Sequence, residues 1–247
     1  MARTAPQADR PAFYALASGG WRDLVTLLHP PYTAWHLSYV AIGAAMAPVV
    51  HPGRLVAALV AFFLAVGVAA HALDELRGRP LRTQLPDRAL IALAVFGLGG
   101  AAAIGIYASA TVSLTLLPFT AAGVFLVLAY DLEWFGGRFH TDFWFAAAWG
   151  AFPAATGFWV NALGLRPAGV LAVAACFALS VAQRRLSSPV RELRRRTVSV
   201  SGEQRLRDGR VIALDTRALA APLDGALRAC AVAVTLLAIA LVVLRLQ

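Results

Sequence analysis

The stretch L-V-A-A-L-V-A-F-F-L-A-V-G-V-A-A-H-A-L-D-E-L-R-G-R-P, residues 55–80, decides the fold, because a long apolar run ends there in a cluster of charges. The run over 55–73 has nearly the length of about 20 residues that a helix needs to cross a bilayer. Asp74 and Glu75 follow three and four residues after His71, so a continuing helix places all three on one face. Ionisable side chains at membrane depth are costly, and they are therefore candidates for a functional site.

The composition of the whole chain is that of a membrane protein. Hydrophobic residues make up 60% of the 247 residues and charged residues only 14%, and the mean hydropathy is +0.69. A water-soluble globule would have too little polar surface at these proportions. We therefore expect an all-α, polytopic membrane helical bundle that forms a single domain over residues 30–247. About seven transmembrane helices are predicted from apolar stretches of about 17–21 residues, at 34–50, 55–73, 89–108, 111–130, 143–162, 167–182 and 225–244.

Arginine supplies all 22 basic residues, and its distribution predicts the orientation in the membrane. The N-terminal segment and the connections after the second and sixth spans are rich in arginine, whereas the connections after the first, third and fifth spans hold only Arg54 and Arg166. The positive-inside rule then places the N-terminus in the cytoplasm. We expect an integral protein of the plasma (inner) membrane. The net charge of +9 is explained by this topology and by attraction to membrane lipid, so no nucleic-acid partner is expected.

Two segments outside the spans carry their own predictions. Residues 1–29 are expected to form a cytoplasmic tail that includes an interfacial amphipathic helix over 12–29, or else a loosely ordered tail. Residues 183–222 are expected to form a basic, flexible cytoplasmic loop. Within it, Asp208-Gly209 lies between short alternating runs, a pattern that also fits a hairpin turn.

A second polar cluster, Y-D-L-E-W-F-G-G-R-F-H-T-D at 130–142, follows the fourth span and lies on the same predicted side as the first. Carboxylates suit Mg²⁺, which usually shares its coordination shell with substrate phosphates, and arginine binds phosphate with two hydrogen bonds. Two such clusters at one mouth predict a Mg²⁺ and diphosphate site. Its candidate catalytic residues are Asp74, Glu75 and Asp131, its candidate metal ligands are Asp74, Glu75, Asp131, Asp142 and His71, and its candidate phosphate ligands are Arg77, Arg79 and Arg138.

The same clusters have alternative interpretations. A D-E-L-R sequence at a helix end is often only an interfacial ion pair, and a histidine beside a carboxylate can orient that carboxylate without binding metal. A second functional hypothesis is a membrane metallohydrolase in which His71, His140 and carboxylates hold Zn²⁺ and activate water. A third is a non-catalytic membrane lipid-binding protein whose clusters are surface ion pairs.

The layout resembles the UbiA superfamily of intramembrane prenyltransferases. P-P-Y-T-A-W-H-L-S-Y-V-A-I-G-A-A at 30–45 resembles the first span of that family. A-H-A-L-D-E-L-R-G-R-P-L-R-T at 70–83 lies where the family carries its first aspartate-rich motif, and Y-D-L-E-W-F-G-G-R at 130–138 lies where it has a tyrosine and basic residues. The resemblance implies a Mg²⁺ and diphosphate cluster at His71, Asp74 and Glu75, with phosphate contacts from Tyr130 and Arg138.

The resemblance also implies the activity, namely Mg²⁺-dependent transfer of a prenyl group from an isoprenyl diphosphate to a lipophilic acceptor at the cytoplasmic face. The chain is a divergent and shortened version of the family pattern, which typically has nine spans. Gly78 stands four residues after Asp74, where the first motif has a second aspartate. The second aspartate-rich motif is replaced by residues 183–196, in which Glu192 is the only acid.

Overall fold

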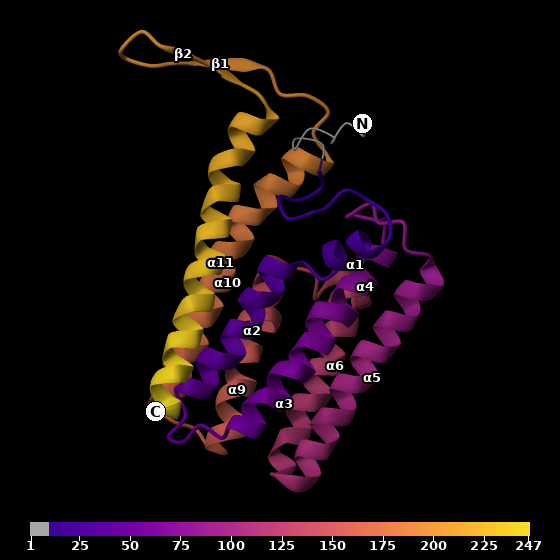
Figure 1. Cartoon of the computed structure of the whole chain (residues 1–247), viewed down its shortest axis with the longest axis vertical. Helices are drawn as coiled ribbons and strands as arrows, with labels where there is room; N and C mark the ends of the chain where they lie inside the picture. Colours follow the sequence, from indigo (N-terminus) through magenta and orange to yellow (C-terminus); the bar gives the residue numbers. More distant parts are fainter. Residues whose placement is uncertain (1–9) are drawn as a thin grey trace.

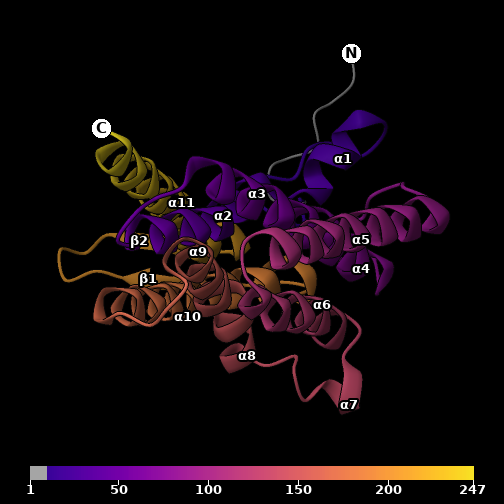
Figure 2. The same cartoon turned by 90° about the horizontal axis from the view of Figure 1, so that it is seen from below.

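The computed structural model describes residues 10–247, so the first nine residues of the predicted tail lie outside it. The described chain is helical apart from one two-stranded hairpin. The long helices run side by side as a bundle, and the hairpin projects from one end of it (Figure 1). In both views α5 and α6 lie on the opposite side of the bundle from α10 and α11 (Figure 1, Figure 2).

The bundle is built from rods that follow the predicted apolar runs. In chain order they are α2 (Pro30–Ala45); α3 (Pro52–Phe62), the π-helical η2 (Phe63–Ala70) and α4 (His71–Leu76); α5 (Asp87–Thr111); the short η3 (Leu114–Leu116) and α6 (Leu117–Asp131); α8 (Asp142–Ala146), the π-helical η4 (Ala147–Ala151) and α9 (Phe152–Ala162); α10 (Pro167–Arg195); and α11 (Thr216–Leu246).

Five of these rods are long and apolar enough to cross a membrane, which indicates an integral membrane protein. They are Pro52–Leu76, Asp87–Thr111, Leu114–Asp131, Pro167–Arg195 and Thr216–Leu246. The predicted all-α architecture is thus confirmed, and five of the seven predicted spans correspond to helices that could cross a membrane. The other two runs also form helices. Helix α2 has 16 residues and is only about 24 Å long, and the run at 143–162, which forms α8, η4 and α9, is not among the five rods that are long and apolar enough.

Helix α2 lies inside the bundle because glycines let it approach α9 very closely. A Cβ atom added at Gly43 would lie 2.0 Å from the Ala154 carbonyl oxygen, and one added at Gly157 would lie 2.1 Å from the Val40 carbonyl oxygen. Small residues allow such close packing between membrane helices, where there is little hydrophobic force to draw helices together. The crossing fixes α2, α9 and the adjoining η4 relative to one another.

The two π-helical stretches present carbonyl groups to histidine side chains. The His71 Nδ1 atom lies 3.2 Å from the carbonyl oxygen of Gly67 in η2, and the His36 Nδ1 atom lies 2.8 Å from the carbonyl oxygen of Trp149 in η4. Widened helical turns of this kind occur frequently at functional sites. Both stretches lie next to the polar end of the bundle that is described below.

One end of the bundle gathers the connections 77–86, 132–141 and 196–215 together with the N-terminal segment 10–29 (Figure 1). We call it the arginine-rich end. The sequence places the connections after the second, fourth and sixth spans on one side of the membrane, and the fold has this arrangement. Its orientation toward the cytoplasm stays a prediction of the positive-inside rule.

The polar segment 183–222 is more ordered than the sequence suggests, and the prediction of a flexible loop over its whole length is wrong. Helix α10 continues to Arg195 and α11 begins at Thr216. A buried ion pair of 2.5 Å between Arg194 and Asp224 fastens the two helices together. Between them, β1 (Gly202–Arg205) and β2 (Val211–Leu214) form an antiparallel hairpin whose turn contains Gly209 with φ of 86°, so the hairpin reading of the D-G sequence is the correct one.

The N-terminal segment forms a shorter helix than the one predicted over 12–29. Only α1 (Trp21–Leu27) is helical there. Its buried Asp23 accepts hydrogen bonds of 2.9 Å from the backbone N–H groups of Gly19 and Gln84. The segment is therefore tied to the connection between α4 and α5 and covers the arginine-rich end.

Candidate functional site

A polar cavity of about 750 Å³ lies at the arginine-rich end, enclosed by the N-terminal segment, α4, the end of α6 and α10. Both predicted polar clusters line it, so the two helix ends converge as the sequence predicts. Its acidic side chains include Asp74 and Asp131, and most of its basic side chains come from α10. The lining residues used below are Tyr14, His29, Tyr32, His71, Asp74, Arg77, Tyr130, Asp131, His140, Arg184, Arg191 and Arg195.

Asp74 and Asp131 are the two predicted metal-binding carboxylates that the fold brings to this cavity. Asp131 is only 8% exposed, and its Oδ2 atom has no hydrogen-bond partner among the described residues. Asp74 is close enough to act on it electrostatically. Buried carboxylate oxygens are nearly always hydrogen-bonded or bound to a cation, so the pair fits a cation that shares its shell with a ligand.

The pair falls short of a complete metal site made by protein alone. Within residues 10–247, no three His, Cys, Asp or Glu side chains are grouped so that they could hold a metal ion. Mg²⁺ is usually held in proteins by one or two carboxylates together with water and substrate phosphates, whereas zinc sites take three or four protein ligands. The donor set therefore suits Mg²⁺ bound jointly with a phosphate better than it suits Zn²⁺.

Arginines of α10 form the basic wall of the cavity. Arg184, Arg191 and Arg195 recur at intervals of seven and four residues, which places them on one face of the helix. Among the described residues, neither Arg191 nor Arg195 forms a salt bridge with a carboxylate, whereas Arg77 does so with Glu133 at 3.1 Å. These arginines were not predicted as site residues because the helix was expected to end near residue 182. Their spacing in the sequence is the signal that could have revealed them.

Two histidines in the lining of the cavity stack face to face. The rings of His29 and His71 have centroids 3.9 Å apart, and both residues line the cavity. Burial lowers the pKa of His29 well below its usual range, and the neighbouring His71 lowers that pKa further. Burial likewise raises the pKa of the adjacent Tyr14 well above its usual range, with a further contribution from Tyr32. His29 was not predicted, because a single histidine before Pro30-Pro31 gives no sign of its partner.

The second cluster contributes Tyr130 and His140 to the same cavity. The His140 Nδ1 atom lies 3.0 Å from the Tyr130 carbonyl oxygen, and its ring lies 4.4 Å from the Tyr130 ring. Tyr130 was predicted as a substrate-binding residue and lines the cavity, and so does Arg77 from the first cluster.

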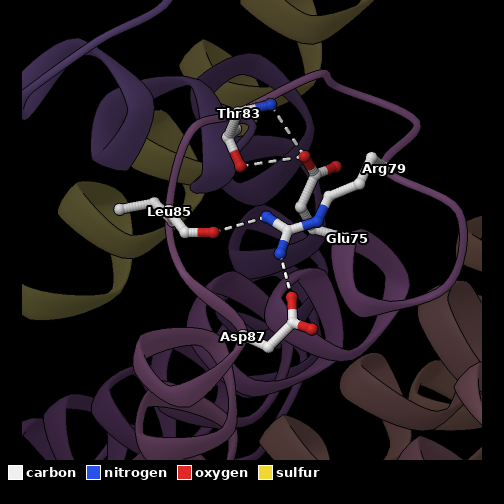
Figure 3. Close-up of polar contacts among 5 residues, drawn as sticks. All are labelled: Glu75, Arg79, Thr83, Leu85 and Asp87. Carbon is white, nitrogen blue, oxygen red and sulfur yellow. Dashed lines mark hydrogen bonds and ion pairs between the residues drawn. The ribbon is translucent and has the colours of Figure 1, made fainter.

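Glu75 has a different position from the one predicted. It is fully buried and does not line the cavity. Its carboxylate accepts hydrogen bonds from the Leu81 N–H at 2.9 Å, the Thr83 N–H at 2.9 Å and the Thr83 hydroxyl at 2.8 Å, and Figure 3 shows the Thr83 contacts. All these donors belong to the connection 77–86. We therefore assign Glu75 the structural role of fixing that connection, and this role replaces the predicted metal-binding and catalytic roles.

Three other predicted residues also lie outside the polar cavity. Arg79 donates to the Leu85 carbonyl oxygen at 2.5 Å and pairs with Asp87 (Figure 3). Asp142 is bound by Arg184 at 2.6 Å on the surface, and this hydrogen bond lowers the pKa of its carboxyl group. Arg138 is exposed on the connection after α6. The fold therefore does not bring Arg79 and Arg138 to the predicted phosphate site, nor Asp142 to the predicted metal site.

A second, apolar cavity of about 290 Å³ lies between α3, α5, α6 and α9. Its walls are mainly alanine, valine and leucine, with the aromatic rings of Phe62, Phe119 and Phe152. Val66 of η2 and Trp149 of η4 line both cavities. The polar and the apolar cavity therefore share part of their walls at the two π-helical stretches.

No protein-family model, curated protein or solved structure matches this chain. Its function is therefore argued from the geometry of the two cavities.

Proposed function

We propose that this chain is a UbiA-like membrane prenyltransferase that binds an isoprenyl diphosphate and transfers its prenyl group to a lipophilic acceptor with the help of Mg²⁺. The observation that carries the proposal is that a polar, arginine-lined cavity and an apolar cavity lie next to each other, with Val66 and Trp149 in the walls of both. A ligand with a polyanionic head and a hydrocarbon tail suits both at once.

The charges of the polar cavity support the diphosphate as the head group. Arg191 and Arg195 make no salt bridge with a carboxylate of the described chain, and both are close enough to Asp74 to act on it electrostatically. Guanidinium groups bind phosphate oxygens with paired, charge-assisted hydrogen bonds. A diphosphate placed here would neutralise the two arginines and leave its remaining oxygens toward Asp74 and Asp131.

The carboxylate pair fits Mg²⁺ in that position. Asp74 and Asp131 would hold the ion together with phosphate oxygens, and the bound ion would stabilise the charge that develops on the departing diphosphate. In the transfer, the bond between the prenyl carbon and the diphosphate oxygen breaks with its electron pair leaving on the diphosphate. The acceptor forms a new bond to that carbon and loses a proton. The chain's own residues bind and orient the head group and keep bulk water away from the reacting carbon.

Replacing Arg191 or Arg195 with glutamine is expected to weaken binding of farnesyl diphosphate about tenfold or more, because each variant loses one charge-assisted contact of about 1.5–3 kcal/mol. Isothermal titration of the full-length protein in detergent measures the change. Arg88→Gln is the matched control, since Arg88 is exposed at the start of α5 and should bind as the wild type does. Equal affinities in all four proteins, or no binding to the wild type, would contradict the proposal.

Asp131→Asn is expected to abolish the effect of Mg²⁺ on binding. In the wild type, Mg²⁺ should tighten farnesyl diphosphate binding about tenfold, because Asp131 would help to hold an ion that offsets the charge of the diphosphate. The variant should bind the ligand equally with Mg²⁺ and with a chelator. Asp142→Asn is the control, because Asp142 lies outside the cavity and should leave the Mg²⁺ response unchanged. A normal Mg²⁺ response in Asp131→Asn would exclude the assigned ligand.

A non-catalytic membrane lipid-binding protein is the second candidate, because a polar cavity beside an apolar cavity would also suit a lipid that is bound without reacting. Such a protein would use the same two cavities but would not break the bond between the prenyl group and the diphosphate. Release of inorganic diphosphate from the bound ligand in the presence of Mg²⁺ separates the two candidates. The zinc metallohydrolase predicted as an alternative has no such support, because its metal needs three or more protein ligands.

A further inference from the structure

The head-group binding proposed above does not use the stacked histidines His29 and His71, although both line the polar cavity. They come from separate parts of the chain, since His29 precedes α2 and His71 begins α4. Two charged imidazoles would repel each other at a ring separation of 3.9 Å. The two rings are therefore not charged together, and each neutral ring has one donor and one acceptor nitrogen.

The hydrogen bonds of the pair leave ring nitrogens for a ligand. His71 Nδ1 is bonded to the carbonyl oxygen of Gly67, which can only accept, so Nδ1 carries the hydrogen and Nε2 is an acceptor. His29 is only 8% exposed, and its Nε2 atom is buried without a partner among the described residues. Buried polar atoms are nearly always satisfied, so this nitrogen at the cavity wall points to a bound polar group.

The surroundings of the pair are aromatic. The Tyr14 ring lies 5.2 Å from His29 and 5.4 Å from Tyr32, and the Tyr32 ring lies 6.4 Å from His29. This wall differs from the arginine wall of α10, because it offers apolar ring surface around a few neutral hydrogen-bonding atoms. It suits a neutral molecule with an apolar body and one polar group.

We propose that His29 and His71 form a subsite for the hydroxyl group of a second, neutral substrate with an apolar body. A hydroxyl group has one hydrogen to donate and lone pairs that accept. It can donate its hydrogen to Nε2 of His71 and accept a hydrogen bond from the ring N–H of His29. One hydroxyl group would then satisfy both histidines. The inference rests on the proposed function, in which this molecule is the lipophilic acceptor. Arg191 and Arg195 also act electrostatically on His29, so the hydroxyl would lie beside the diphosphate.

Farnesol and farnesyl methyl ether test the subsite, because they share an apolar chain and differ in the hydroxyl hydrogen. With inorganic diphosphate present, the full-length protein in detergent should bind farnesol about tenfold more tightly than the ether. In His29→Phe and in His71→Phe, the ratio of the affinities for farnesol and the ether should fall to about one. His51→Phe is the control, since His51 lies between α2 and α3 and does not line the cavity, and it should keep the preference.

Binding of inorganic diphosphate to the same variants shows that the cavity is folded and separates the two proposals. Diphosphate affinity should be retained in His29→Phe and His71→Phe and should fall about tenfold in Arg191→Gln. Equal binding of farnesol and its ether to the wild type overturns the subsite, and so does a preference that persists in both histidine variants. The wild type could fail to bind diphosphate but still prefer farnesol, while the histidine variants show no preference. This result overturns the proposed function but supports the hydroxyl subsite.

Discussion

Gly157→Ala is expected to lower the free energy of unfolding by about 3 kcal/mol or more, because the added methyl group has no space at the crossing of α2 and α9. A Cβ atom there would lie 2.1 Å from the Val40 carbonyl oxygen and 2.9 Å from the carbonyl carbon. Both atoms belong to backbone, so no side-chain rotation relieves the collision. The two helices must separate, and the packing of α2 along α9 is lost.

Thermal unfolding of the protein in detergent measures this effect as a lower Tm. Gly99→Ala is the matched control, since Gly99 is also a helical glycine but a Cβ atom added there meets nothing within 4 Å. Alanine favours the helix at such a position, so the control should be neutral or slightly more stable. A Tm for Gly157→Ala equal to that of the control would show that α2 and α9 are not in close contact.

The bundle could be predicted from the sequence because the bilayer leaves few alternatives. A backbone in lipid must satisfy its own hydrogen bonds, so apolar runs of sufficient length become helices. The alternation of arginine-rich and arginine-poor connections then places both polar clusters at one end. That topology alone places Asp74 and Asp131 at the same end of the bundle.

The basic wall of the cavity could not be predicted in the same way. After residue 182 the chain becomes too polar for a membrane span, and hydropathy alone gives no reason for the helix to continue. Helix α10 nevertheless runs on to Arg195, because Gln183, Ser187 and Val190 pack inward and Arg194 pairs with Asp224 of α11. These are tertiary contacts between distant segments, and they are what brings the arginines to the site.

The choice between Asp74 and Glu75 shows a second limit of the sequence. Both are carboxylates near the end of one helix, and neighbouring positions on a helix point about 100° apart. Which of them faces the cavity is decided by the connection 77–86, which folds back and donates its hydrogen bonds to Glu75. His29 and His71 give the same lesson, since their contact exists only after the N-terminal segment has folded over α4.

Glu75→Gln is therefore expected to lower the free energy of unfolding by about 3 kcal/mol, because a buried carboxylate that accepts three hydrogen bonds is replaced by an amide. The amide keeps one oxygen but turns an NH₂ group toward donors of Leu81 or Thr83, and these donors then lose their acceptor. Glu133→Gln is the control, since its exposed ion pair with Arg77 should contribute less than about 1 kcal/mol.

The same variant separates a structural role of Glu75 from the metal-binding role that its sequence position suggests. A carboxylate that only holds the connection 77–86 should lower the Tm when it is replaced, while the response of farnesyl diphosphate binding to Mg²⁺ stays as in the wild type at a temperature where the variant is folded. A metal ligand should behave in the opposite way, because removing an unpaired buried charge relieves repulsion and leaves the Tm unchanged or higher. Loss of the Mg²⁺ response in Glu75→Gln with an unchanged Tm would show that Glu75 is a metal ligand. Glu75 and Asp74 would then have the same role.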